Sequence, residues 1–246
     1  MTTHHNHPVV LVPGHWLGAW AWDQVASRLR EAGRRTVALT LPGLDPHDPR
    51  RSGRTLDDQA DAVAAALRQQ ADDVCPAVLV AHSGANAPAS MVLDRHPELV
   101  CHMVWVDTGP AAPGTVFAPD APAEVPLPAF DTLAAQASLD GLDADALARF
   151  RDLAVPQPGL VLRQPVKLTN AARLAVPTTL VCCSLPAAQV MELARSGHPM
   201  FAEVTSLRHC DTVDLPTGHW PMWSRPDELA NIIAAAATGQ AARTAR

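Results

Sequence analysis

The amino-acid sequence predicts an α/β fold, in which a doubly wound, mostly parallel sheet carries an inserted helical cap. Short apolar segments alternate with segments of helical periodicity along most of the chain. Such alternation is typical of a parallel sheet that helices cover on both faces. The alternation fails between residues 109 and 169, where proline and alanine are frequent. We therefore expect this segment to be an insertion between two parts of one continuous core.

Continuous apolar runs that end at a turn indicate the strands. A parallel sheet buries both faces of its strands, so these runs need not alternate with polar residues. The expected strands are residues 9–12, 36–41, 77–81, 101–106 and 176–183, with a last one inside 204–214.

Apolar residues at helical spacing indicate the helices between these strands. The sequence from Thr55 to Asp58 has the form of a capping box, which would begin one of them. The expected helices cover residues 19–32, a segment after 55, residues 85–95, a segment around 191–195 and residues 224–237.

The length of 246 residues suits a single domain of the larger kind. We assign residues 8–108 and 170–240 to the α/β core and residues 109–169 to the cap. Within the cap, only short helical segments are expected, near 133–139 and 143–153.

Composition and charge limit the kinds of partner and the cellular location that we expect for the protein. The formal net charge is −6 and no basic run occurs, so nucleic acid and anionic membranes are not expected partners. No apolar stretch is long enough to cross a bilayer, and the polar N-terminus lacks the apolar region of an export signal. The five cysteines are odd in number and form no C-x-x-C motif. Free thiols and a cytoplasmic location are expected.

Ser83 is the strongest candidate for a nucleophile. It stands between an apolar strand and a helix, in the sequence Ala81-His82-Ser83-Gly84-Ala85. A sharp turn at this position lifts the hydroxyl clear of the sheet and leaves the Gly84 amide free at the start of the helix. The alternative interpretation is an ordinary N-cap, a position at which serine is common.

The turn after the first strand, Pro13-Gly14-His15-Trp16, can bring a backbone amide towards this serine. We expect the amides of His15 and Gly84 to form an oxyanion hole. A Pro-Gly pair after a strand is also simply a turn.

His219 is the candidate general base. It follows the last expected strand, in the sequence Gly218-His219-Trp220-Pro221. A serine needs a base within hydrogen-bond reach at neutral pH, and histidine has a suitable pKa.

These three segments resemble motifs of the α/β-hydrolase superfamily. More narrowly, they are similar to its small esterase, methylesterase and hydroxynitrile lyase group, which carries an H-G-x-x-x-x-x-W loop, a G-H-S-x-G elbow and a late G-H-x-P motif. Residues 13–20, 81–85 and 218–221 take those places, although Ala81 and Ala85 replace the two elbow glycines. The resemblance extends from about residue 9 to residue 229 and implies a serine hydrolase that acts through an acyl-enzyme.

The acid of the expected triad departs from this pattern. In the resembling group it commonly follows the strand matched here by residues 176–183, but no carboxylate stands there, and Glu192 and Glu203 are poorly placed. Asp107, directly after the strand 101–106, is the residue we favour, because an acid at this earlier strand end occurs elsewhere in the superfamily. Asp107 also fits an ordinary turn, since Asp-Thr-Gly-Pro is a favourable turn sequence.

Trp16, His82, Trp220 and Met222 flank these motifs and would form an apolar, aromatic substrate-binding site. As core residues they would need no further explanation. No histidine pair with a carboxylate has metal-ligand spacing, and no G-x-G-x-x-G follows a strand. We therefore expect no metal and no cofactor. The expected partner is a small-molecule substrate, and a homodimer is compatible with the sequence.

The sequence leaves three functions open. The first is hydrolysis of a small to medium, largely apolar carboxylic ester, lactone or thioester. The second is a cofactor-free lyase reaction of the hydroxynitrile lyase type on the same residues. Such a lyase typically needs a basic side chain near the pocket, and Lys167 is the one lysine, at the far end of the cap. The third is binding of a small ligand without turnover.

Overall fold

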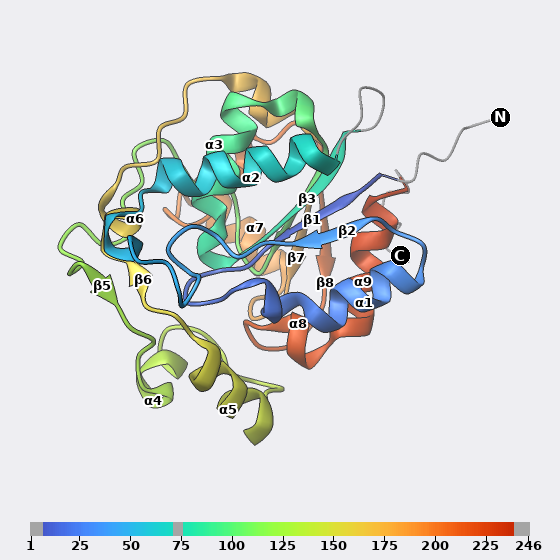
Figure 1. Ribbon diagram of the computed structural model, residues 1–246. Helices are drawn as coiled ribbons and strands as arrows, with labels where there is room; N and C mark the ends of the chain where they lie inside the picture. Colours follow the sequence, from blue (N-terminus) through green and yellow to red (C-terminus); the bar gives the residue numbers. More distant parts are fainter. Residues whose placement is uncertain (1–6, 71–75, 239–246) are drawn as a thin grey trace.

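The computed structural model describes residues 7–70 and 76–238. Six parallel strands form one sheet, with helices on both of its faces (Figure 1). Across the sheet, the strands lie in the order β2 (Thr36–Ala38), β1 (Val9–Val12), β3 (Ala77–His82), β4 (Val100–Val106), β7 (Thr178–Cys182) and β8 (Cys210–Asp214). The predicted doubly wound, mostly parallel α/β fold is confirmed. The first six residues of the histidine-rich N-terminus and Cys75 lie outside the described residues.

The central strands are apolar because both of their faces are buried. In β1, Val9 and Leu11 belong to one hydrophobic core, whereas Val10 and Val12 belong to the core on the opposite face. Every residue of β1 and β3 is buried. Alternate side chains of a strand point to opposite faces of a sheet, so a continuous apolar run supplies two cores at once.

Helices α1 and α9 pack together over one face, and α2 and α3 pack together over the other. The main helices are α1 (Asp23–Glu31), α2 (Leu56–Gln70), α3 (Asn86–Arg95), α7 (Ala187–Arg195), α8 (Pro221–Ser224) and α9 (Pro226–Ala236). Short 3₁₀ helices are η1 (Ala19–Trp22), η2 (Arg51–Gly53), η3 (Ser83–Ala85), η4 (Pro97–Leu99), η5 (Ala171–Ala175) and η6 (Ala202–Ser206).

The predicted capping box of α2 is confirmed. The Thr55 amide donates to Asp58 Oδ2 at 2.8 Å, and the Asp58 amide donates to Thr55 Oγ1 at 3.1 Å. The C-terminal helix differs from its prediction, because α8 ends at Ser224 and α9 begins at Pro226. Proline has no amide hydrogen and its ring clashes with the preceding turn, so it begins a helix but does not continue one.

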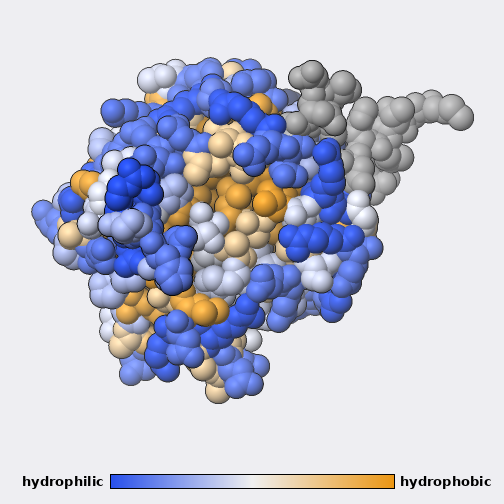
Figure 2. All heavy atoms as spheres, viewed as in Figure 1, coloured by the Kyte–Doolittle hydropathy of each residue, from blue (hydrophilic) through white to orange (hydrophobic). Residues whose placement is uncertain are grey.

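Polar side chains cover most of the face seen in Figure 2. Apolar side chains reach the surface between α2 and α1, where the edge strand β2 lies (Figure 2). Among the described residues, no helix has both the length and the apolar character that a membrane span requires.

The chain leaves the sheet after β4 and returns to it at β7, which pairs directly with β4. Between them lie α4 (Phe130–Ala134), α5 (Ala144–Leu153), α6 (Gly159–Arg163) and a two-stranded antiparallel ribbon of β5 (Glu124–Val125) and β6 (Gln157–Pro158). The sequence predicted helical pieces here but not the ribbon, because strands of two residues leave no periodic pattern. The exact domain boundaries stay a prediction.

Asp94 lies on α3 and forms hydrogen bonds with the end of this inserted segment. Its Oδ1 accepts hydrogen bonds from the amides of Thr169 and Asn170, both at 2.7 Å, and the Asn170 side chain donates to the Asp94 carbonyl at 3.0 Å. The Asp94 side chain is buried, so its carboxylate has little access to water and depends on these donors.

We expect Asp94→Ala to lower the free energy of unfolding by about 1–3 kcal/mol, because the amides of Thr169 and Asn170 would lose the acceptor that they share. Asp94→Asn keeps an acceptor oxygen and should lose less than half as much. Urea denaturation of the two variants and the native chain measures the difference. Equal losses in both variants would contradict this role for the carboxylate oxygen.

Candidate active site

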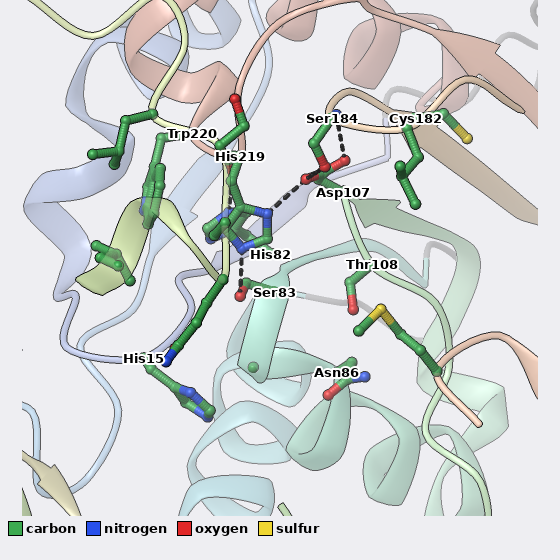
Figure 3. Close-up of a pocket in the computed structure, with 18 of the residues that line it drawn as sticks. His15, His82, Ser83, Asn86, Asp107, Thr108, Cys182, Ser184, His219 and Trp220 are labelled. Atoms are coloured by element: carbon green, nitrogen blue, oxygen red, sulfur yellow. Dashed lines mark hydrogen bonds and ion pairs between the residues drawn. The ribbon is translucent and has the colours of Figure 1, made fainter. Parts of the chain in front are cut away.

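Ser83 lies at the sharp turn between β3 and α3 (Figure 3). Its φ is 52°, in the left-handed region that residues other than glycine rarely adopt. The turn approaches the loop after β1 so closely that a Cβ on Gly14 would lie 2.9 Å from the Ser83 Cβ. Ala81 and Ala85, which replace the usual elbow glycines, are both buried within the turn. The alanines are therefore compatible with the strained geometry that exposes the hydroxyl.

Ser83, His219 and Asp107 form a continuous series of hydrogen bonds (Figure 3). The Ser83 Oγ lies 2.8 Å from His219 Nε2, and His219 Nδ1 lies 2.6 Å from Asp107 Oδ2. The serine follows β3, the aspartate follows β4 and the histidine lies on the loop after β8. Parallel strands place these carboxyl ends at one edge of the sheet, so residues 136 positions apart meet.

Asp107 accepts more hydrogen bonds than the one from His219. The Ser184 hydroxyl donates to Oδ2 at 2.6 Å, and the amides of Cys183 and Ser184 donate to Oδ1 at 3.0 and 2.9 Å. Burial by itself would raise the pKa of Asp107, but the hydrogen bonds and charge of His219 and the bonds from Ser184 outweigh it, so the pKa lies below its usual range. The carboxylate therefore stays ionised at neutral pH.

Ser184 is a site residue that the sequence analysis missed. It follows β7, at the place where the resembling group commonly carries the acid. Here the segment supplies hydrogen-bond donors to an acid on the neighbouring strand. The missing carboxylate after this strand was the available signal, because an acid after β4 needs a donor, not a second anion, beside it.

His82 forms a hydrogen bond to the loop after β8 that carries His219, which we call the histidine loop. Its Nε2 lies 2.7 Å from the His219 carbonyl oxygen, which can only accept, so Nε2 carries the proton. The ring is 1% exposed, and its Nδ1 has no hydrogen-bond partner among the described residues. Burial, followed by the nearby His219, lowers the pKa of His82 to about 3. His82 is therefore neutral, and its polar contact is to the histidine loop.

Gly84 and His15, whose amides we expect to form an oxyanion hole, lie in contact with each other. The Gly84 amide belongs to the first turn of a helix, where amides have no acceptor within the helix. The His15 imidazole packs directly on Gly84, since a Cβ added to Gly84 would overlap that ring. Burial, followed by the charge of His219, lowers the pKa of His15 to about 4, so this ring is neutral as well.

The inserted segment holds both loops of the site through its main chain. Val125 O accepts from Trp16 Nε1 and the Val155 amide donates to Trp16 O, both at 3.0 Å. The His219 amide donates to Ser138 O at 2.8 Å. The cap therefore fixes the loop after β1 and the histidine loop relative to each other.

A cavity of about 750 Å³ opens above Ser83. Trp16, His82 and Trp220 line it, and their role in substrate binding stays a prediction, whereas Met222 is not part of the lining. Met222 is fully buried in the core formed with α1 and α9. The reason is geometric, because residues two positions apart on a helix turn do not share a face, and Trp220 takes the face towards the cavity.

Charged groups in the cavity wall are few. Among the described residues that line it there is neither lysine nor arginine. Lys167 is exposed and lies outside the lining. No group of three His, Cys, Asp or Glu side chains in the described part of the chain could hold a metal ion.

Comparison with known proteins shows the family to which the chain belongs. The sequence matches the alpha/beta hydrolase family over residues 9–232, so the chain belongs to that family. It is also similar to methylesterases: methylesterase 18 of Arabidopsis thaliana is 33% identical over 114 residues, which are 46% of this chain and 43% of that protein. The match thus spans less than half of the relative's length. The predicted resemblance to the esterase group of this fold is confirmed.

Solved structures agree on the fold. An extracellular alpha/beta-hydrolase from a Paenibacillus species has a TM-score of 0.71 and 20% identity, covering 94% of this chain and 98% of that one. A methylesterase from Arabidopsis has a TM-score of 0.69 and 16% identity, covering 92% and 97%. At these identities the likeness concerns the fold alone.

We expect Gly84→Ala to lower the free energy of unfolding by about 1–3 kcal/mol, because the new Cβ would overlap the His15 ring. In a His15→Ala background the same substitution should lose less than half of that. Urea denaturation of the two single variants and the double variant forms the cycle. An equal loss in both backgrounds would show that the ring is not the obstacle.

We expect His82→Leu to slow labelling of Ser83 by a fluorophosphonate about three- to tenfold, because the His219 carbonyl would lose its hydrogen bond and the histidine its fixed position. His82→Gln retains an N–H near the same place and should recover part of the rate. Thermal unfolding of both variants controls for folding. Native labelling rates in the leucine variant would exclude this positioning role.

Proposed function

We propose that this protein hydrolyses a carboxylic ester through a covalent acyl-enzyme on Ser83. The observation that carries the proposal is the unbroken series of hydrogen bonds from Ser83 through His219 to Asp107 at the floor of the cavity. A serine is a weak nucleophile until a base takes its proton, and His219 Nε2 lies within reach to do so.

In the first half of the reaction, Ser83 Oγ attacks the ester carbonyl carbon while His219 Nε2 takes the hydroxyl proton. The negative charge that develops on the carbonyl oxygen is stabilised by the amides of Gly84 and His15, and each such donor contributes about 10²–10³ in rate in comparable enzymes. His219 then gives its proton to the departing alkoxide, and an alcohol leaves. Ser83 remains acylated.

In the second half, water replaces the alcohol. His219 takes a proton from water, the resulting hydroxide attacks the acyl carbon, and collapse of the intermediate returns the proton to Ser83 and releases a carboxylic acid. Asp107 stays ionised through both halves and stabilises the imidazolium that forms twice. It also keeps the Nδ1 proton in place, so that Nε2 faces the serine as a base.

The cavity favours an uncharged substrate. No lysine or arginine is present among the described lining residues to pair with an anion, and aromatic and aliphatic side chains form most of the wall. A volume of about 750 Å³ admits a small to medium ester, lactone or thioester. Similarity to a methylesterase supports the ester class.

Hydrolysis is favoured over the two other functions. A lyase of the hydroxynitrile type would use a further basic side chain such as a lysine in the pocket, and the described lining residues include neither lysine nor arginine. A binding protein without turnover would have no need of an ionised acid oriented on the histidine. A reducing compartment such as the cytoplasm remains our expectation, which the free thiols of Cys182, Cys183 and Cys210 support.

Hydrolysis of p-nitrophenyl esters from acetate to octanoate tests the proposal. We expect Ser83→Ala to abolish turnover and Asp107→Asn to reduce kcat by about two to four orders of magnitude, because the histidine would lose its orientation and its counter-charge. Ser27→Ala and Asp211→Asn, which change exposed residues, serve as matched controls. Turnover that persists in Ser83→Ala would overturn the mechanism.

A further inference from the structure

Three large apolar side chains are exposed among the described residues, and two of them line the active-site cavity. Phe117 is 39% exposed and Met200 is 57% exposed, and both belong to the cavity wall. Leu153, 42% exposed, is the third and lies outside it. A single exposed apolar residue is ordinary on a protein surface, whereas several gathered at one cavity indicate a binding surface.

We propose that Phe117 and Met200 form an outer subsite that binds the apolar tail of an extended ester while its carbonyl lies at Ser83. The inference rests on the proposed esterase function and adds the substrate class, namely neutral esters with a long or bulky apolar group. The occupant is the substrate because the two side chains continue the same cavity that contains Ser83 and His219.

Phe117 is held in position on the cap side of the subsite. The Ala118 amide donates to Leu162 O at 3.0 Å, which fixes the backbone next to it. The Phe117 ring also contacts the His15 ring edge to face, with the ring centroids 5.7 Å apart. Phe117 thereby presents an aromatic surface beside the residue whose amide we assign to the oxyanion hole, and substrate contact there needs little reordering.

Met200 belongs to a later part of the chain than Phe117, between α7 and η6. The next residue, Phe201, is 5% exposed and packs in the core, and its amide donates to His198 O at 2.9 Å. This anchor leaves the Met200 thioether at the surface of the cavity. Methionine is unbranched and polarisable, so it adapts to tails of different shape.

The side chains that line the cavity determine which ester tails the subsite would prefer. With no lysine or arginine among the described lining residues, a tail gains affinity from burial of apolar surface and not from charge. Each methylene that becomes buried increases affinity by at most about fourfold. A preference for longer acyl groups should therefore grow stepwise with chain length until the tail extends past the two side chains.

The test compares p-nitrophenyl acetate with p-nitrophenyl octanoate in Phe117→Ala, Met200→Ala and the double variant. We expect the ratio of kcat/KM for octanoate to that for acetate to fall about tenfold in the double variant. Met200→Leu, which keeps an apolar side chain of similar size, should retain most of the ratio. Leu153→Ala is the matched control, because it removes an equally exposed apolar side chain outside the cavity, and its ratio should stay native.

A binding measurement separates this inference from the proposed function. We expect Ser83→Ala to bind 2-decanone more tightly than 2-butanone in calorimetric titration, and the added Phe117→Ala and Met200→Ala changes to weaken 2-decanone binding about tenfold. Absence of ester hydrolysis by the native chain would overturn the proposed function while leaving this binding result to decide the subsite. Unchanged ester ratios together with unchanged 2-decanone binding would overturn the subsite.

Discussion

The carboxylate of Asp107 is the interaction on which the arrangement of the site depends. It accepts hydrogen bonds from His219, from the Ser184 hydroxyl and from the amides of Cys183 and Ser184. One buried anion thus joins the ends of β4 and β7 to the histidine loop. Burial alone would favour the neutral acid, so the anion depends on these donors.

Backbone strain is concentrated in residues that line the cavity. Trp16, Ser83 and Asp107 are the three non-glycine residues with positive φ in the described part of the chain, and all three belong to the candidate site. Each such residue is destabilised by about 1–2 kcal/mol relative to an ordinary conformation. The fully buried strands β1 and β3 hold two of these turns in place, which explains how a strained serine can persist at the end of a rigid element.

The inserted segment is part of the site's framework as well as its cover. Through main-chain hydrogen bonds it holds the Trp16 loop on one side and the Gly218–His219 segment on the other. It also supplies Phe117 to the cavity wall, whereas Met200 comes from the core. Movement of this segment would therefore alter the Trp16 loop and His219 together.

The sequence by itself determined the α/β fold and the turn that carries Ser83, because strand and helix periodicity and the elbow motif are local patterns. It also pointed to His219 and Asp107, yet it left the acid open, since only the pairing of β4 with β7 brings Ser184 to the carboxylate. Tertiary structure alone decided that Met222 turns into the core and that His82 binds the histidine loop. Side-chain direction at a loop depends on what packs against it, and no local pattern records those distant neighbours.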